Sequence, residues 1–402
     1  MCNEIRISVP YIQSVSGDQA RLVADVDIGG KKTSIWFSVY EKYAKYLCAE
    51  RGDAFVIGLL PVAMRRGFDI ICEAPVDERL LFQIRSTLMP LLARYGKNVH
   101  EVKIDAPVAA QPMENAGGVG AGISCGVDSL HIVKNHSSDG YPGLKLTHLV
   151  LNNVGAFGET GISNQYNWTI DLSRRFCEKY GFELVLTNSN IFDVVNVDFE
   201  QNHTYLNTFA IYCLQKLWKV FYYGSWGVDL QNGFTLLDNE LHDCASYDML
   251  LLDAFSTEKL KIYSEGAAYG RYQKTAHIID FEPAHNFLQV CVSGTGRNCG
   301  YCFKCRRTLL TLDALGALNQ FSNVFDINAY KFDRKSHLRY LFRVHLERSD
   351  KMLGEVYNII KKDISLDCRI LGAWDFYRDL CICKLKDALR PTFKKLGLLK
   401  RK

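Results

Sequence analysis

The sequence predicts an α/β protein built around a parallel, doubly wound sheet of five strands, with an α+β domain before it and a helical region after it. Short apolar runs alternate with segments of helical periodicity in the middle of the chain, which indicates βαβ units. The first hundred residues combine a hairpin pattern with helical repeats, and the chain after about residue 310 has helical periodicity. We expect domains at 1–110, 111–315 and 316–402.

The clearest element of the first domain is a β-hairpin. Apolar residues alternate over 22–28, Gly29-Gly30 follows, and the alternation resumes over 31–39. Two glycines between alternating runs are typical of a two-residue hairpin turn. Leucine and isoleucine at three-to-four spacing then predict helices at about 41–50 and 76–95.

Five short apolar runs supply the expected strands of the central sheet. They lie at about 118–124, 146–152, 182–188, 218–224 and 286–292. Strands connected by helices pair in parallel, and helices then cover both faces of the sheet. Ligands of such sheets bind at the carboxyl ends of the strands, so the residues that follow each strand are the candidates for a site.

The composition limits the classes of function. The chain has a net charge of +4, 48% hydrophobic residues and only 9 prolines, and its cationic residues are spread along its length. This distribution argues against a dedicated nucleic-acid binder. The N-terminus lacks the apolar core of a signal peptide, and the longest apolar stretch, around 54–64, is too short to span a bilayer. We therefore expect a cytoplasmic protein without a membrane partner.

The segment from Ser124 to Ser129 is the main candidate for anion binding. Its residues Ser-Cys-Gly-Val-Asp-Ser connect the first expected strand to a helix. A helix N-terminus presents unpaired N–H groups and the positive end of a dipole, and the hydroxyls of Ser124 and Ser129 add donors. Because Asp128 repels a bare phosphate, we expect it to act through Mg²⁺ or through the loop's own N–H groups. The alternative is a plain strand-to-helix turn capped by Ser124 or Asp128.

The pattern Ser-x-Gly-x-Asp-Ser between a strand and a helix resembles the PP-loop of the ATP pyrophosphatase superfamily. The resemblance implies that Ser124, Cys125, Gly126, Val127, Asp128 and Ser129 bind ATP, which is cleaved between its α and β phosphates. The usual pattern has a second glycine where this chain has Cys125. A cysteine at a helix N-terminus is also a candidate nucleophile, although a small buried filler is the commoner use of the residue.

Four cysteines lie close together in the sequence. Cys291, Cys299, Cys302 and Cys305 have the spacing C-x7-C-x2-C-x2-C. Two residues between sulfurs is the spacing of a tetrahedral zinc site, and four thiolates leave no open position, so the site is structural rather than catalytic. An iron–sulfur cluster has related spacing and stays an alternative.

The loop and the four cysteines together resemble the 7-cyano-7-deazaguanine synthase family over roughly residues 117–315. Members of that family adenylate a carboxylate, form an amide with ammonia and convert the amide to a nitrile with further ATP. The family's substrate loop, Ser-Gly-Tyr-Pro-Asp-Cys-Arg, is not found here. The resemblance therefore implies carboxylate or carbonyl activation in a divergent branch, with ATP, Mg²⁺ and Zn²⁺ as cofactors.

Further candidates follow the second and fourth strands and the segment near residue 270. Asn153 ends the second strand, where related enzymes seat the adenine or ribose; a buried asparagine that caps the strand is the alternative. Arg271 and Lys274 are the candidate cations for phosphate, and solvated lysine and arginine are the alternative. Less specific candidates around the fourth strand are Ser225, Trp226 and Asp229. We expect surface or hydrogen-bonded side chains for the four histidines without metal-like spacing, which are His203, His242, His277 and His285.

The sequence thus predicts an ATP-dependent ligase that acts on a small-molecule carboxylate, with Asp128, Arg271 and Lys274 as the catalytic residues. We expect no nucleic-acid partner, and a homodimer is a candidate assembly. Two alternatives stay open. One is a sulfurtransferase that acts on a nucleotide or tRNA, and the other is a sensor subunit that binds ATP without turnover.

Overall fold

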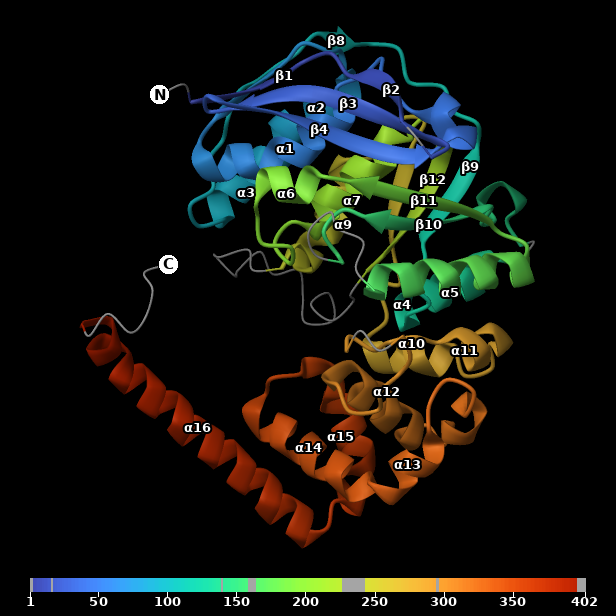
Figure 1. Cartoon of the computed structure of the whole chain (residues 1–402), viewed down its shortest axis with the longest axis vertical. Helices are drawn as coiled ribbons and strands as arrows, with labels where there is room; N and C mark the ends of the chain where they lie inside the picture. The colour runs from blue at the N-terminus through green and yellow to red at the C-terminus, as the bar shows by residue number, and fades with distance from the viewer. Residues whose placement is uncertain are drawn as a thin grey trace. The chain divides into compact units, whose positions relative to one another are not determined.

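The computed structural model divides into two compact units (Figure 1), and each is described by itself. It describes residues 3–15, 17–138, 140–157, 164–225, 243–293 and 296–395. Unit 1 is Met1–Gln289 with Gly294–Arg297, and unit 2 is Val290–Ser293 with Asn298–Lys402. Neither domain boundary expected from the sequence, after residue 110 or after 315, coincides with the division between these units.

A mixed sheet of eleven strands forms the centre of unit 1, within the described residues. The strand order is β13-β12-β9-β10-β11-β4-β3-β1-β5-β7, and β2 pairs with β3. Its strands are β1 (Glu4–Ile7), β2 (Tyr11–Val15), β3 (Gln19–Ile28), β4 (Lys31–Tyr40), β5 (Asp69–Cys72), β7 (Ile104–Asp105), β9 (Gly118–Gly122), β10 (His148–Asn153), β11 (Glu183–Ser189), β12 (Trp218–Gly224) and β13 (Lys261–Glu265). Two further short strands, β6 (Val76–Asp77) and β8 (Val108–Ala109), pair with each other.

The N-terminal strands belong to the same sheet as the five central strands. β3 and β4 form the expected hairpin, with Ile28 opposite Lys31 and both Gly29 and Gly30 at positive φ. β4 then pairs antiparallel with β11, Thr187 lying opposite Val39. Backbone hydrogen bonds between β4 and β11 join the N-terminal strands to the central strands in one sheet. The N-terminal α+β region therefore does not have a sheet of its own.

Five strands of this sheet, β13, β12, β9, β10 and β11, run parallel to one another. Four of them lie where the sequence predicts strands. The fifth prediction, a strand at 286–292, is wrong: Glu282–Phe287 forms α11, and the fifth strand is β13. Two apolar residues of that run, Phe287 and Leu288, are buried at the end of this helix and just after it, whereas Val292 is 40% exposed. β13 is an edge strand of mixed polarity, so it lacks the apolar run that marks its neighbours.

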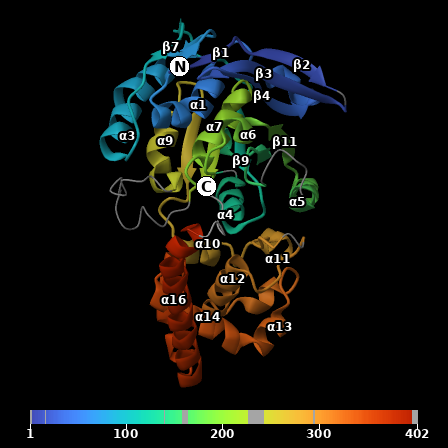
Figure 2. The ribbon, with the colours of Figure 1, turned by 60° about the vertical axis from the view of Figure 1, so that its left-hand side comes forward.

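Helices pack on both sides of the sheet, with α5 on one side and α1 and α7 on the other in Figures 1 and 2. α5 contacts β10 and β11, α4 contacts β9 and β12, and α1 packs against α7. The helices of unit 1 are α1 (Asp53–Arg66), α2 (Glu78–Gln83), α3 (Met89–Tyr95), α4 (Val127–His136), α5 (Asn164–Tyr180), α6 (Ile191–Val195), α7 (His203–Cys213), α9 (Asp248–Ala254), α10 (Arg271–His277) and α11 (Glu282–Phe287). Short 3-10 helices lie at η1 (Glu41–Tyr46), η3 (Pro142–Leu144) and η4 (Cys244–Tyr247), and the π-helical segment η2 (Ile84–Leu88) connects α2 to α3.

The glycines of β9 allow aromatic side chains of β12 to pack against it. A Cβ atom on Gly120 would lie 2.9 Å from ring atoms of both Trp218 and Phe221. Side chains larger than hydrogen would therefore push the two strands apart. The glycines therefore allow β9 and β12 to pair, and the candidate loop follows the end of β9.

Unit 2 is helical, as the sequence predicts. Its elements are α12 (Phe303–Ala314), η5 (Leu318–Phe321), α13 (Ile327–Phe332), α14 (Arg334–Glu347), η6 (Lys351–Leu353), α15 (Gly354–Ile360), η7 (Lys361–Asp363) and α16 (Leu366–Lys395). Buried Leu310, Phe321 and Leu341 form part of its interior. α14 packs on α16, and Arg339 donates to both carboxylate oxygens of Asp375 across this contact.

In the part of the chain that the structure describes, no helix combines the length and the apolar composition needed to cross a bilayer.

Candidate functional site

The segment Ser124–Ser129 connects β9 to α4 at the carboxyl end of the parallel strands. β9 has β10 on one side and β12 on the other. From β9 the chain adds β10 and β11 on one side and later β12 and β13 on the other, so the strand order changes direction between β9 and β12. Sheets of this kind bind ligands at such a switch point. The fold therefore indicates the same place as the sequence motif does.

The first turn of α4 offers N–H groups to a ligand. Gly126 is the N-cap residue of α4, and no side chain caps this end of the helix. The Ser129 hydroxyl donates to the Gly126 carbonyl at 3.1 Å, and the Gly126 N–H lies 3.4 Å from Ser124 Oγ. These weak local contacts shape the turn. The capping by Ser124 or Asp128 that belonged to the alternative, a plain strand-to-helix turn, is not formed.

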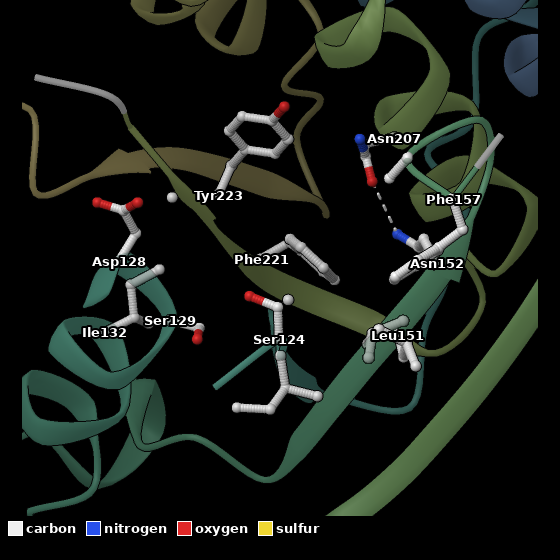
Figure 3. Close-up of a pocket in the computed structure, with 15 residues that line it drawn as sticks. Ser124, Asp128, Ser129, Ile132, Leu151, Asn152, Phe157, Asn207, Phe221 and Tyr223 are labelled. Atoms are coloured by element: carbon white, nitrogen blue, oxygen red, sulfur yellow. Dashed lines mark hydrogen bonds between the residues drawn. The ribbon is translucent and has the colours of Figure 1, made fainter. Parts of the chain in front are cut away.

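A pocket of about 240 Å³ lies directly in front of this turn. Figure 3 shows Ser124, Asp128 and Ser129 on one side of it and Asn152, Asn207 and Phe157 on the other. Its lining is polar near the helix and largely apolar elsewhere. The apolar lining residues are Ile123, Ile132, Val150, Leu151, Ala156, Phe157 and Phe221. The pocket can therefore hold an anionic group at one end and a planar apolar group at the other.

The three residues expected to be catalytic form a cluster of ion pairs. Arg271 NH1 lies 2.8 Å from Asp128 Oδ2, and Lys274 Nζ lies 3.1 Å from Asp128 Oδ1. Lys274 also donates to the Ser225 carbonyl, and its side chain is only 1% exposed. Burial acts to raise the pKa of Asp128, but the charges of Arg271 and Lys274 outweigh it and lower this pKa below its usual 3.8. Asp128 is therefore a carboxylate, and two cations offset its single negative charge.

This pairing changes the expected role of Asp128. The repulsion between its carboxylate and a phosphate is offset by Arg271 and Lys274 rather than by contacts with loop N–H groups. Neither cation lines the pocket; both approach Asp128, which does. Their effect on a ligand in the pocket is therefore electrostatic, through a cluster whose formal charge is positive.

Gly266 makes room for the buried lysine. It has a φ of +77°, and a Cβ atom there would lie 2.9 Å from Lys274 Cε. A residue with a side chain would meet both a strained backbone and the lysine. Gly266, which follows β13, thus leaves the space that Lys274 needs to reach Asp128.

Cys125 occupies the position at which the loop needs a glycine-like backbone. Its φ is 54°, in the left-handed region, and the residue is 0% exposed. Its carbonyl accepts from the Gln289 N–H at 2.8 Å, which ties the loop to the segment after α11. Burial raises the pKa of the Cys125 thiol, so the thiol is neutral and away from the pocket. This geometry favours the filler role over the nucleophile.

Some residues expected to bind the nucleotide do not line the pocket. Cys125 and Val127 are buried beneath the loop, and Asn153 is buried with its amide donating to Asn188 Oδ1 at 2.9 Å. Its neighbour Asn152 lines the pocket instead, because adjacent residues of a strand face opposite sides. Asn152 donates to Asn207 Oδ1 at 3.3 Å and accepts from the Thr187 hydroxyl at 2.8 Å. Three further candidates, Trp226, Asp229 and His242, lie outside the described residues.

The four cysteines come together in unit 2. The Sγ atoms of Cys291, Cys299, Cys302 and Cys305 all lie within 4.8 Å of one another, and those of Cys291 and Cys302 are 3.9 Å apart. A tetrahedral zinc site with Zn–S bonds of about 2.3 Å has sulfur atoms about 3.8 Å apart. The cluster is therefore a candidate metal site with a donor set that zinc accepts.

Backbone hydrogen bonds prepare these sulfurs for a metal. Cys299 Sγ accepts from the N–H groups of Cys302 at 3.3 Å and Tyr301 at 3.4 Å, and Cys302 Sγ accepts from the Cys305 N–H at 3.4 Å. Burial opposes ionisation of Cys299, but the hydrogen bonds from Cys302 and Tyr301 outweigh it and lower the pKa of this thiol to about 6. Metals bind the thiolate form, so the turn favours ligation.

Asn298 holds the two parts of the cysteine cluster together. Its side-chain oxygen accepts from the N–H groups of Val290 at 2.9 Å and Cys291 at 3.2 Å, and its amide donates to the Val324 carbonyl at 3.0 Å. Cys291 is separated from the other three ligands by the longest of the three spacers, and this asparagine fixes its place beside them. Nothing in the cysteine spacing indicated this residue.

Comparison with models of protein families, with curated proteins and with solved structures returned no match to this chain.

Proposed function

We propose that this chain binds ATP in the pocket at the start of α4 and activates a carboxylate of a small substrate by adenylation. The observation that carries the proposal is the uncapped N-terminus of α4, which faces a pocket lined by Ser124 and Ser129. Helix N-termini with nearby hydroxyls favour phosphate groups. The side of the pocket away from α4, where Phe157 and Leu151 lie beside the amides of Asn152 and Asn207, suits the adenine.

In this proposal the β and γ phosphates lie at the start of α4. The N–H groups of its first turn and the hydroxyls of Ser124 and Ser129 bind them, while Arg271 and Lys274 offset Asp128. Mg²⁺ would neutralise the phosphates from the open side. The substrate carboxylate attacks the α phosphorus, a carboxylate O–P bond forms, and the bond from that phosphorus to the bridging oxygen breaks as pyrophosphate leaves. Ammonia then displaces AMP to form an amide, which further ATP can dehydrate to a nitrile.

We assign zinc rather than an iron–sulfur cluster to the four cysteines. The Sγ atoms of all four cysteines lie within 4.8 Å of one another, which is the spacing of four sulfurs around a single tetrahedral ion, whereas cysteines bound to different irons of a cluster lie farther apart. In unit 2 this ion would join the segment at Cys291 to the start of α12, so its role is structural.

The experiment is an assay of the products of ATP. Purified protein is incubated with ATP, Mg²⁺, an ammonium salt and each member of a panel of small carboxylates, and AMP and pyrophosphate are quantified against ADP and phosphate. The proposal expects AMP and pyrophosphate in equal amounts, dependent on one carboxylate, and a strong loss in a Ser124→Ala/Ser129→Ala variant. Formation of ADP and phosphate would contradict adenylation. Tight binding of ATP without pyrophosphate release across the panel would favour the sensor.

A sulfurtransferase needs a reactive thiol near the phosphates. Cys125 is the cysteine of the loop, and its thiol is buried with a raised pKa. Adenylation for ligation is therefore the better supported of the two enzyme functions.

A further inference from the structure

A second group of metal-binding side chains lies in unit 1. His203, the first residue of α7, comes close to Asp243 and Cys244 at the start of η4, and one ligand atom from each lies within 4.8 Å of the other two. His203 Nε2 and Asp243 Oδ1 are 3.1 Å apart. Ligands bound to one zinc ion at about 2.0 Å are separated by about 3.3 Å, so this pair already has the spacing of two zinc ligands.

We infer that His203, Asp243 and Cys244 bind a second zinc ion, beside the wall of the pocket. An imidazole, a carboxylate and a thiolate form a mixed donor set that suits this metal. Within the described residues these three side chains supply the ligand atoms, and the fourth position of the ion would be taken by water or another group. The site thus differs from the four-cysteine cluster, which has no open position.

The other nitrogen of His203 has the partner that a ligating histidine needs. Nδ1 lies 2.8 Å from the Tyr223 hydroxyl, which fixes the ring so that Nε2 faces Asp243. Metal-ligating histidines almost always use their second nitrogen in this way, and such partners orient the ring and tune its basicity. The carboxylate is held as well, because Asp243 Oδ1 accepts from the Ala245 N–H at 2.8 Å.

The sulfur of Cys244 is placed as a thiolate ligand would be. It accepts from the Thr204 N–H at 3.3 Å and lies 3.2 Å from the Thr204 hydroxyl. The same kind of N–H···S bond supports the cysteines of unit 2. Cys244 is 0% exposed, whereas the side chains of His203 and Asp243 are 19% and 28% exposed, so the group has one open side.

Tyr223 connects this group to the pocket. It lies in β12 and lines the pocket (Figure 3). Its hydroxyl also contacts His203. A zinc ion held by the three residues would therefore stand next to the pocket but on the far side of the tyrosine from Ser124. This inference does not depend on ATP, since metal binding is measured without nucleotide.

The test is the zinc content of the purified full-length chain. The inference expects about two zinc ions per chain in the unaltered protein, one from each group. His203→Asn, Asp243→Asn and Cys244→Ser should each lose one ion, and Cys302→Ser should lose the other. Cys213→Ser is the matched control, since Cys213 is equally buried in α7 but outside both groups, and it should retain both. A single ion in the unaltered protein that Cys302→Ser removes would overturn the inference.

A second measurement does not require the His203 and Cys244 variants to fold. The Cys302→Ser chain is titrated with Co²⁺, whose thiolate charge-transfer band reports the number of sulfur ligands. The inference expects one tightly bound Co²⁺ with a single-thiolate band and tetrahedral visible bands. Absence of tight Co²⁺ binding, or octahedral spectra without a thiolate band, would show that the three side chains form a hydrogen-bonded group only.

Discussion

Lys274 Nζ lies 3.1 Å from Asp128 Oδ1 although the lysine side chain is only 1% exposed. A buried ammonium group is costly unless it is paired, and Asp128 is the carboxylate that pairs it. The same carboxylate lines the pocket. Asp128 thus has two roles: it pairs the buried charge of Lys274 in unit 1, and it places a carboxylate in the lining of the candidate site.

Asp128→Asn should therefore destabilise unit 1. The amide leaves Lys274 buried without a counter-charge, and we expect the free energy of unfolding to fall by about 3 kcal/mol, measured by urea denaturation at neutral pH. Adding Lys274→Met should restore most of that loss, because it removes the fully buried ammonium group, while Arg271, which also loses its partner, is 16% exposed and keeps some contact with water. Asp171→Asn, which removes an exposed pair with Arg174, is the control and should cost less than about 1 kcal/mol. Equal effects of Asp128→Asn and Asp171→Asn would contradict the assignment.

Substitutions of Cys125 should separate its backbone role from its thiol. Cys125→Gly relieves the left-handed backbone but loses a small buried side chain, so its stability should stay within about 1 kcal/mol of the unaltered chain. Cys125→Val places a β-branched residue at a φ of 54° and should cost about 2 kcal/mol or more.

The thiol itself is tested by Cys125→Ala, which retains the Cβ atom and removes only the sulfur. Pyrophosphate release by Cys125→Ala should stay within about threefold of the unaltered chain, since the buried thiol takes no part in it. Loss of all activity in a stably folded Cys125→Ala chain would support thiol chemistry and contradict the ligase.

Asp53 should make the stability of unit 1 depend on pH. It is 0% exposed, and burial raises its pKa to about 6 despite hydrogen bonds from the Asp77 N–H at 2.7 Å and Gln215 at 3.0 Å. A raised pKa in the folded state means that its stabilising contribution is complete below pH 3.8 and is lost as the pH rises through about 6.

The comparison is with Asp53→Asn, which cannot ionise. Relative to this variant, the unaltered chain should lose about 2 kcal/mol of stability between pH 4 and pH 7.5, measured by urea denaturation across that range. A constant difference for Asp53→Asn would mean that Asp53 ionises normally in the folded protein.

Removal of one ligand from the four-cysteine cluster should release its metal and loosen unit 2. Cys299→Ser and Cys302→Ser should each reduce zinc, measured by elemental analysis, by one ion per chain and should increase proteolysis within α12. Cys381→Ser, on the exposed part of α16, should change neither. Iron and labile sulfide in the purified protein, with visible absorbance that Cys302→Ser abolishes, would assign an iron–sulfur cluster instead.

Elements marked by local patterns were predictable from the sequence. The hairpin of β3 and β4 has alternation and two turn glycines, and β9 with its loop combines an apolar run, small residues and a helix start. The cysteine cluster follows from its spacing. Each of these signals lies within a few consecutive residues, which is where backbone preference and side-chain periodicity act.

Features that depend on distant contacts were not predictable. The pairing of β4 with β11 joins residues about 150 positions apart, and the sequence of neither strand indicates which strand it pairs with. β13 was missed because an edge strand carries polar side chains. His203 was expected to be a surface or hydrogen-bonded histidine, and it is hydrogen-bonded, but its contact with Asp243, forty residues away in sequence, depends on the fold that brings α7 and η4 together.

The central claim is that the pocket in front of α4 holds the phosphates of ATP, and equilibrium binding of Mg–ATP tests it most directly. Gly122 lines this pocket, and a Cβ atom there meets no atom within 4 Å, so Gly122→Leu should fill the pocket without disturbing its neighbours. Gly354→Leu, equally unobstructed but in unit 2, is the control. We expect calorimetry to show one ATP per chain for the unaltered protein and for Gly354→Leu, and a Kd at least about tenfold higher for Gly122→Leu. Equal affinity of Gly122→Leu and the unaltered chain, or no ATP binding by the unaltered chain, would contradict the claim.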